Sequence, residues 1–72
     1  MQLNQLKQLC DKTVILHLTD GEVSKVKIIY VDDEYEDIIA DVLETSRPDR
    51  YRDSSAVYTI AAVDIMSAEL SE

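Results

Sequence analysis

This 72-residue chain has only one cysteine, one proline and one glycine, so few of its residues can cross-link the chain or interrupt its strands and helices. It also has no tryptophan and no phenylalanine. The single cysteine, Cys10, cannot form an internal disulfide. No apolar run approaches the roughly 20 residues that cross a bilayer, and no signal-peptide pattern opens the chain. These absences predict a cytoplasmic protein that does not contact a membrane.

Basic residues are also scarce. Seven Lys and Arg stand against fifteen Asp and Glu, so the formal net charge is −8. Proteins bind nucleic acids largely by neutralising phosphates with a cationic surface, and the chain as a whole repels a polyanion. Acidity of this kind also keeps a protein in solution. A nucleic-acid partner would therefore need a local group of cations.

Apolar residues are plentiful, at 46% of the chain, which excludes a disordered polypeptide. We expect a single domain over residues 1–72. A domain of this size buries a low fraction of its surface, so its stability is marginal unless subunits associate. The composition therefore predicts an oligomer.

Two periodicities divide the first part of the chain. Leucines at helical spacing predict a short amphipathic helix within residues 1–10, covering one end of a sheet: Leu3, Leu6 and Leu9. From residue 13 the period is two, which predicts a strand whose inner face carries Val14, Leu16 and Leu18. Asp20-Gly21 then predicts a hairpin, because glycine accepts a positive φ without steric cost.

Further strands are predicted over residues 22–31 and 37–44, each with apolar residues on both faces. A sheet that needs cover on both sides favours a closed barrel or a subunit interface. Residues 46–55 are polar and predict a loop, and two short strands follow over residues 56–61 and 63–70. The chain thus contains one helix followed by five strands.

The helix, the five strands and the Asp-Gly hairpin together resemble the Sm-like superfamily, which includes Sm, LSm and Hfq proteins. Residues 13–44 are similar to the family's first motif, and residues 56–70 are similar to its second. The matching positions are Asp32, Asp41, Glu44, Tyr58 and Ala61. The resemblance implies a mainly β fold, with a short N-terminal helix followed by a five-stranded, strongly bent antiparallel Sm-like (SH3-type) barrel.

The positions equivalent to the family's nucleotide pocket carry different chemistry. They are Asp32, Glu34, Tyr35, Glu36, Ala61 and Ala62. Base binding in the family uses a stacking ring, an Asn and a basic side chain, and a carboxylate such as Glu34 or Glu36 replaces none of them. We therefore expect the usual uridine pocket to be substituted. A glycine that bends the second strand in relatives is Val26 here, so we expect a bulge or a gentler twist instead.

The resemblance also implies a homo-oligomeric ring in which the fourth strand of one subunit pairs with the fifth strand of the next. We expect its interface to contain Val57, Tyr58, Ile60, Val63, Ile65 and Met66. The predicted function is a non-enzymatic scaffold or interaction module without a cofactor. A monomeric SH3-like domain that binds a peptide is an alternative of a different class, and it would show no self-association.

One local group of cations supports a further alternative, an RNA-binding regulator of the Sm or Hfq type. Arginines and a tyrosine interleave in the loop: Arg47, Arg50, Tyr51 and Arg52. Such interleaving is typical of contacts with nucleic acids or acidic partners. The competing interpretation is a solvated loop whose arginines pair with Asp49 and Asp53.

Catalytic and metal sites are not predicted. His17 is the only histidine, and its place in the strand alternation favours a surface or interface position; Cys10 ends the apolar stripe of the helix as a small packed residue. No Ser-His-Asp set and no glycine-rich phosphate loop can be assembled. The acidic turn lacks the glycine and the ligand spacing of a calcium loop: Asp32, Asp33, Glu34, Glu36 and Asp37.

Overall fold

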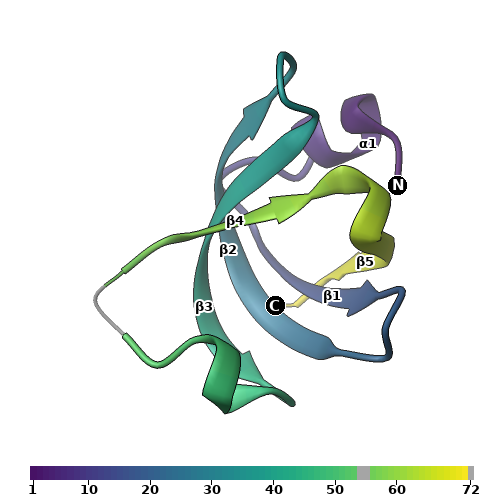
Figure 1. Cartoon of the computed structure of the whole chain (residues 1–72). Coiled ribbons are helices and arrows are strands. Elements are labelled where there is room, and N and C mark those ends of the chain that lie inside the picture. Colours follow the sequence, from purple (N-terminus) through teal and green to yellow (C-terminus); the bar gives the residue numbers. More distant parts are fainter. Residues whose placement is uncertain (54–55, 72) are drawn as a thin grey trace.

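The computed structural model describes residues 1–53 and 56–71, so Ser54 and Ser55 of the predicted loop lie outside the described residues, as does Glu72. The fold is mainly β, with one short α-helix, five strands and two 3-10 turns (Figure 1). In chain order these are α1 (Leu3–Lys7), β1 (Thr13–Leu18), β2 (Val23–Asp32), β3 (Asp37–Thr45), η1 (Pro48–Arg50), β4 (Tyr58–Ala61), η2 (Ala62–Asp64) and β5 (Ile65–Leu70).

The five strands form one antiparallel sheet in the order β4-β3-β2-β1-β5. The closed barrel expected from the sequence is not formed, because β4 and β5 lie at opposite edges of the hydrogen-bonded order. The turn η2 separates these two strands, and it occupies residues where the fifth strand was expected to begin. The sheet is therefore strongly curved but open (Figure 1).

Bulges bend the long second strand, as the absence of a glycine there predicts. The register between β2 and β3 shifts between Lys25 and Val26, and again between Ile28 and Tyr30. A bulge adds a residue to one strand and changes the face that later side chains occupy. Consequently Tyr30, expected on the same face as Ile28, is exposed instead, and Val31 turns into the core.

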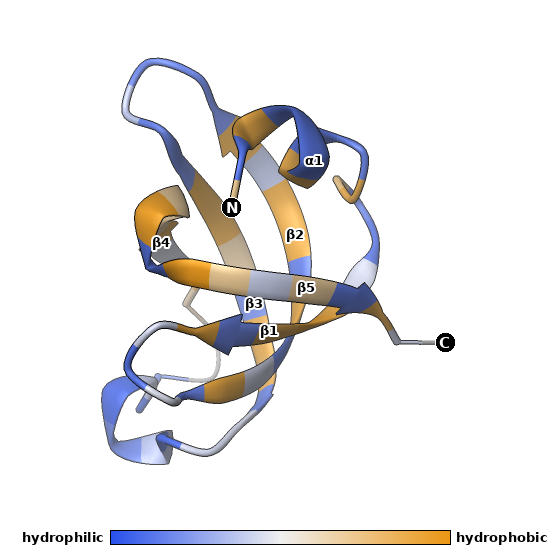
Figure 2. Cartoon of the chain, turned by 90° about the vertical axis from the view of Figure 1, so that its right-hand side faces the viewer, coloured by the Kyte–Doolittle hydropathy of each residue, from blue (hydrophilic) through white to orange (hydrophobic). Residues whose placement is uncertain are grey.

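One face of the curved sheet and the helix enclose the core. Its buried apolar residues are Leu6, Val14, Leu16, Leu18, Val26, Ile28, Val31, Ile38, Ala40, Ile60, Ala62 and Ile65. Figure 2 shows α1 across one end of the sheet, with apolar residues coloured along α1 and β2. The alternation predicted for the first strand is confirmed, since its three inner residues are buried and His17 is only half-buried.

The helix is shorter than predicted and ends at Lys7, not near residue 10. Asp11 adopts a left-handed φ of 66°, which turns the chain into β1. The terminal ammonium of Met1 donates hydrogen bonds to the carbonyls of Ala62, at 3.0 Å, and Ile65, at 2.6 Å. These bonds hold the start of the chain against η2 and β5.

The predicted Asp-Gly hairpin is present between β1 and β2. Gly21 has a φ of 94°, and its N–H donates to the carbonyl of Leu18 at 3.1 Å. The carboxylate of Asp20 accepts the N–H of Glu22 at 3.0 Å. This short turn delivers Glu22 to the start of the second strand, where the candidate site begins.

Candidate functional site

Glu22 is a carboxylate with 0% of its surface exposed. Three donors surround its two oxygens: the Ser24 hydroxyl at 2.7 Å, the Tyr51 hydroxyl at 2.7 Å, and Nη1 of Arg50 at 3.0 Å. A buried charge is tolerated only where it is paired and hydrogen-bonded, and this one satisfies both conditions. The second strand is therefore tied to the loop that follows β3.

Arg50 bridges two carboxylates, because its Nη1 also lies 2.8 Å from Oδ2 of Asp20. The backbone N–H of Glu22 and the Arg50 guanidinium lower the pKa of Asp20. Asp20, and after it Glu22, raise the pKa of Arg50. Burial, followed by the hydrogen bond to Glu22, raises the pKa of the Tyr51 phenol. The network thus holds Asp20 and Arg50 charged and Tyr51 neutral.

The structure places the four predicted loop residues in different roles. Arg50 and Tyr51 point inward to carboxylates of the first hairpin, while Arg52 donates through Nε to the backbone carbonyl of Asp49 at 3.2 Å. Arg47 reaches the carbonyl of Asp20 through Nη2 at 3.4 Å. Arg50 therefore pairs across the fold with Asp20 and Glu22, two partners that the sequence did not indicate.

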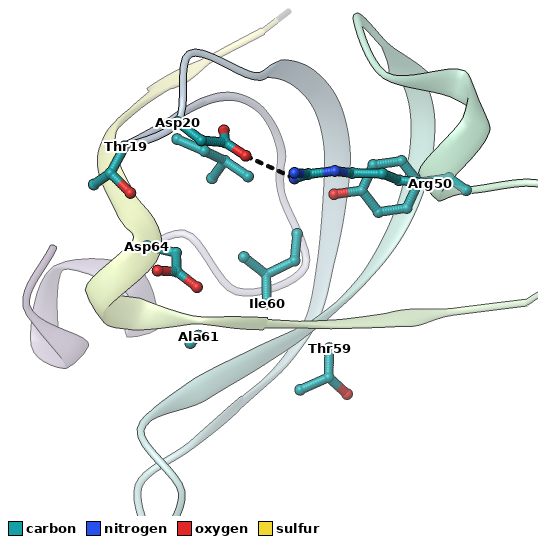
Figure 3. Close-up of a pocket in the computed structure, with 9 residues that line it drawn as sticks. Thr19, Asp20, Arg50, Thr59, Ile60, Ala61 and Asp64 are labelled. Carbon is teal, nitrogen blue, oxygen red and sulfur yellow. Dashed lines mark ion pairs between the residues drawn. The ribbon is translucent and has the colours of Figure 1, made fainter.

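A cavity of about 310 Å³ opens beside this network (Figure 3). It lies between the end of β1, the loop and β4, and is lined by Leu18, Thr19, Asp20, Arg50, Tyr51, Thr59, Ile60, Ala61 and Asp64. Figure 3 shows Asp64 on the same side as Thr19 and Asp20, with Arg50 across from them. The lining is mostly polar at its rim, with Leu18 and Ile60 reaching it from the core.

The strand β4 contributes its unpaired edge to this cavity. In an antiparallel pair, alternate residues exchange N–H and C=O bonds with the partner strand, and those between direct these groups away. The N–H of Ala62 donates to the carbonyl of Glu36 at 2.9 Å, and Ala61 lies opposite Asp37. Because Ala62 bonds to Glu36, just before β3, the alternation along β4 directs the backbone N–H and C=O groups of Thr59 and Ala61 away from β3. Both residues line the cavity.

The two segments that resemble family motifs meet at Ala62, next to Ala61 of the cavity lining. Asp32 caps its turn by accepting the N–H groups of Glu34, at 2.8 Å, and Tyr35, at 3.2 Å. Glu36 has a left-handed φ of 53°, and its carbonyl binds Ala62. The side chains of Glu34 and Tyr35 point into solvent, with Tyr35 73% exposed. Of the motif-equivalent positions, Glu36 and Ala62 are therefore joined by a backbone hydrogen bond, and Asp32 is bonded to Glu34 and Tyr35 within its own turn.

The predicted interface residues divide into two groups. Ile60 and Ile65 belong to the core of the subunit itself, and Tyr58 is half-buried with its ring 5.0 Å from that of Tyr51. The exposed members are Val57, Val63 and Met66. Only this second group offers side chains to a partner.

The remaining candidates stay at the surface. His17 lies 3.3 Å from the carboxylate of Glu69 on the neighbouring strand, and the Cys10 thiol faces the Ile29 carbonyl at 3.5 Å. Lys7 pairs with Asp33 of the acidic turn at 2.6 Å. In residues 1–53 and 56–71, no three His, Cys, Asp or Glu side chains are grouped so as to hold a metal ion.

Sequence reasoning missed Glu22, although a signal for it exists. The inner-face alternation of the second strand, extended backwards from Ile28 through Val26 and Ser24, places Glu22 on the core side. A carboxylate in phase with core residues needs a cation or donors to enter with it. Its partners lie 28 and 29 residues along the chain, so spacing alone could not name them.

The chain matches no family model, no curated protein and no solved structure. Among the described residues, none of the helical segments has the length and apolarity needed to cross a bilayer.

Proposed function

We propose that this protein is a non-enzymatic interaction module of the Sm-like type that assembles with copies of itself through the two edges of its sheet. One observation carries the proposal: within the described residues, β4 pairs only with β3 and β5 pairs only with β1. Unpaired strand edges are templates for pairing with another chain. A single copy therefore presents two complementary edges.

The backbone groups that point outward from each edge strand support pairing between β4 of one copy and β5 of the next. The N–H of Ser71 donates to the carbonyl of Thr13 at 3.0 Å, so Ala68 and Leu70 direct their backbone groups away from β1. Thr59 and Ala61 do the same on β4. The register of β4 is regular, whereas β5 has a register shift at Met66, between the pairs His17–Ser67 and Leu18–Ile65. Ala68 and Leu70 lie beyond that shift, and no proline stands on either strand to prevent addition of another strand there.

Exposed apolar side chains flank both edges. Val63 is 78% exposed, Met66 is 65% exposed, and Leu70 is 53% exposed. Fully burying a side chain of this size contributes about 1.5–3 kcal/mol. Edge pairing would cover these residues and would continue the sheet from one subunit to the next, which suits a small domain whose single-chain core is modest.

Ala61 offers a direct test. Its φ of −69° and ψ of 138° are values that proline adopts, and its N–H faces away from β3. Replacing Ala61 with proline therefore removes a donor from the outer edge while the fold is retained. Native mass spectrometry of the wild type should show an oligomer, and Ala61→Pro should shift it to monomer without lowering the thermal midpoint.

Ala62→Pro is the matched control, because the N–H of Ala62 is used inside the subunit by Glu36. This neighbouring variant should lower the thermal midpoint. A wild type that is monomeric at all concentrations would contradict the proposal and favour the monomeric peptide-binding alternative. An oligomer unaffected by Ala61→Pro would show that subunits meet through another surface.

A further inference from the structure

The cavity beside β4 carries an imbalance of charge. Two carboxylates line it, Asp20 and Asp64, and a third, Glu22, lies buried behind Arg50. Among the described residues of the lining the one cation is Arg50, whose Nη1 is already shared between Asp20 and Glu22. Arg47, just outside the lining, reaches the carbonyl of Asp20 at 3.4 Å, so three carboxylates stand against two guanidinium groups. Asp64 forms no ion pair within the described residues. The cavity therefore favours an occupant with positive charge.

The backbone beside the cavity favours an occupant with an extended main chain. Thr59 and Ala61 direct their N–H and C=O groups away from β3, along this side of β4, and both residues line the cavity. A strand that pairs with an edge places alternate side chains on one face, where pockets select them. One side chain of an added strand would thus lie next to Asp64.

The fifth strand of a second copy does not supply that charge. Residues 65–70 read Ile-Met-Ser-Ala-Glu-Leu, with no Lys or Arg and with one more carboxylate. Pairing between copies would satisfy the backbone edge and would leave the cavity without a cation. A different strand, with a basic side chain, complements this surface better.

We propose that the cavity and the adjoining edge of β4 form a docking site for an extended peptide, with a Lys or Arg side chain of that peptide bound in the cavity against Asp64. The side chain of Thr19 also lines the cavity, on the same side of Figure 3 as Asp64. A cavity of about 310 Å³ falls within the size range of ligand sites, about 300–1,000 Å³. This site shares its edge with the proposed assembly, so a bound basic peptide competes with a second copy for β4.

The test uses two capped pentapeptides, Thr-Val-Arg-Val-Thr and the same sequence with norleucine in place of arginine. Each is titrated into isotope-labelled full-length protein and followed by amide NMR shifts and calorimetry. The arginine peptide should shift the amides of Thr59, Ala61 and Asp64 and should bind at least about fivefold more tightly than the norleucine peptide. Equal binding of the two peptides would overturn the cationic subsite.

Two variants with the same change of charge locate the site. Asp64→Asn removes a carboxylate from the cavity. Glu34→Gln removes one from the exposed turn between β2 and β3, which does not line the cavity. Asp64→Asn should lose the preference for arginine, while Glu34→Gln should keep it. Equal effects of the two variants, or wild-type shifts confined to residues 32–37, would mean non-specific attraction to an acidic protein and would refute the proposal. The oligomer's mass, measured without peptide, reports on assembly separately, so either idea can fail alone.

Discussion

The Tyr51 hydroxyl donates a 2.7 Å hydrogen bond to Glu22, a carboxylate with no exposed surface. The two residues are 29 positions apart, and their bond joins the loop after β3 to the first hairpin. Arg50 adds a charged contact to the same carboxylate. The wall of the cavity beside β4 is therefore fixed by a buried acid.

Replacing Glu22 by glutamine keeps the size of the side chain and removes its charge. Arg50 and Tyr51 then lose their charged acceptor, and hydrogen bonds to charged groups contribute about 1.5–3 kcal/mol. We expect Glu22→Gln to lower the free energy of unfolding in urea by about 2 kcal/mol. Glu34→Gln, on the exposed turn, should change it by less than about 0.5 kcal/mol. Equal stability of the two variants would show that the buried network contributes nothing.

The raised pKa of Tyr51 predicts that the protein loses stability at alkaline pH. Its pKa is raised above the ordinary value of 10.0 by burial and by Glu22, so the folded state favours the neutral phenol. A pKa raised on folding contributes stability that is complete below the unfolded pKa and disappears as the pH rises through the folded value.

Urea unfolding at about pH 8 and about pH 11 measures this contribution. The wild type should lose more stability between the two than Tyr51→Phe, which has no phenol to ionise at this position. Tyr35→Phe is the control, since Tyr35 is exposed, and it should behave as the wild type. The same loss in all three proteins would mean that other groups dominate at high pH.

The backbone pattern was predictable because it depends on local residues. The period of two over β1 and the Asp20-Gly21 turn define the first hairpin, and the structure confirms both. With Val26 where the resemblance implied a bending glycine, a bulge or a gentler twist was expected, and β2 contains two register shifts. The side of the sheet on which Tyr30 lies was not predictable, because one inserted residue moves every later side chain of the strand to the opposite face.

The site itself depends on tertiary pairing. Arg50 has Asp49 one residue away, and the sequence favours that neighbour; the fold brings Asp20 and Glu22 instead. Closure of the barrel also could not be decided from the pattern, because it depends on whether β4 and β5 meet, and η2 separates them. Contacts between distant residues follow from the curvature of the sheet, which no local spacing encodes.

Gly21 is required for its conformation and not for space. Its φ is 94°, and a Cβ added there would have no atom within 4 Å. We expect Gly21→Ala to cost about 1–2 kcal/mol, and Gly21→Asn to cost less, because asparagine tolerates a left-handed backbone better. Thermal unfolding followed by circular dichroism would rank the variants. An asparagine variant as unstable as the alanine variant would point to a cause other than φ.

The RNA-binding alternative is tested through Arg52, which is exposed and forms only a backbone contact, to Asp49, within the described residues. Under the function proposed here, fluorescence anisotropy should detect no salt-dependent binding of single-stranded uridine RNA. If RNA does bind, affinity should fall steeply with salt and weaken in Arg52→Ala, because each phosphate contact releases counterions. That result would favour the regulator. Arg50→Ala cannot serve here, since it also leaves buried Glu22 without its cation.

Met66 and Ser67 are neighbours on β5 with opposite roles at its edge. Met66 is an exposed apolar side chain beside the unpaired edge, whereas the register places Ser67 opposite His17, with its backbone groups directed to β1. A glutamate at either position adds the same charge to a chain of net charge −8. Met66→Glu should dissociate the assembly in sedimentation velocity, because a desolvated carboxylate at an apolar contact is costly, while Ser67→Glu should leave it intact.

Added salt should restore some association of Met66→Glu if repulsion between copies is the cause, since salt screens exposed charges over about 10 Å at 0.1 M ionic strength. Equal dissociation by both variants would show that net charge limits assembly and that the edge of β5 is not its contact.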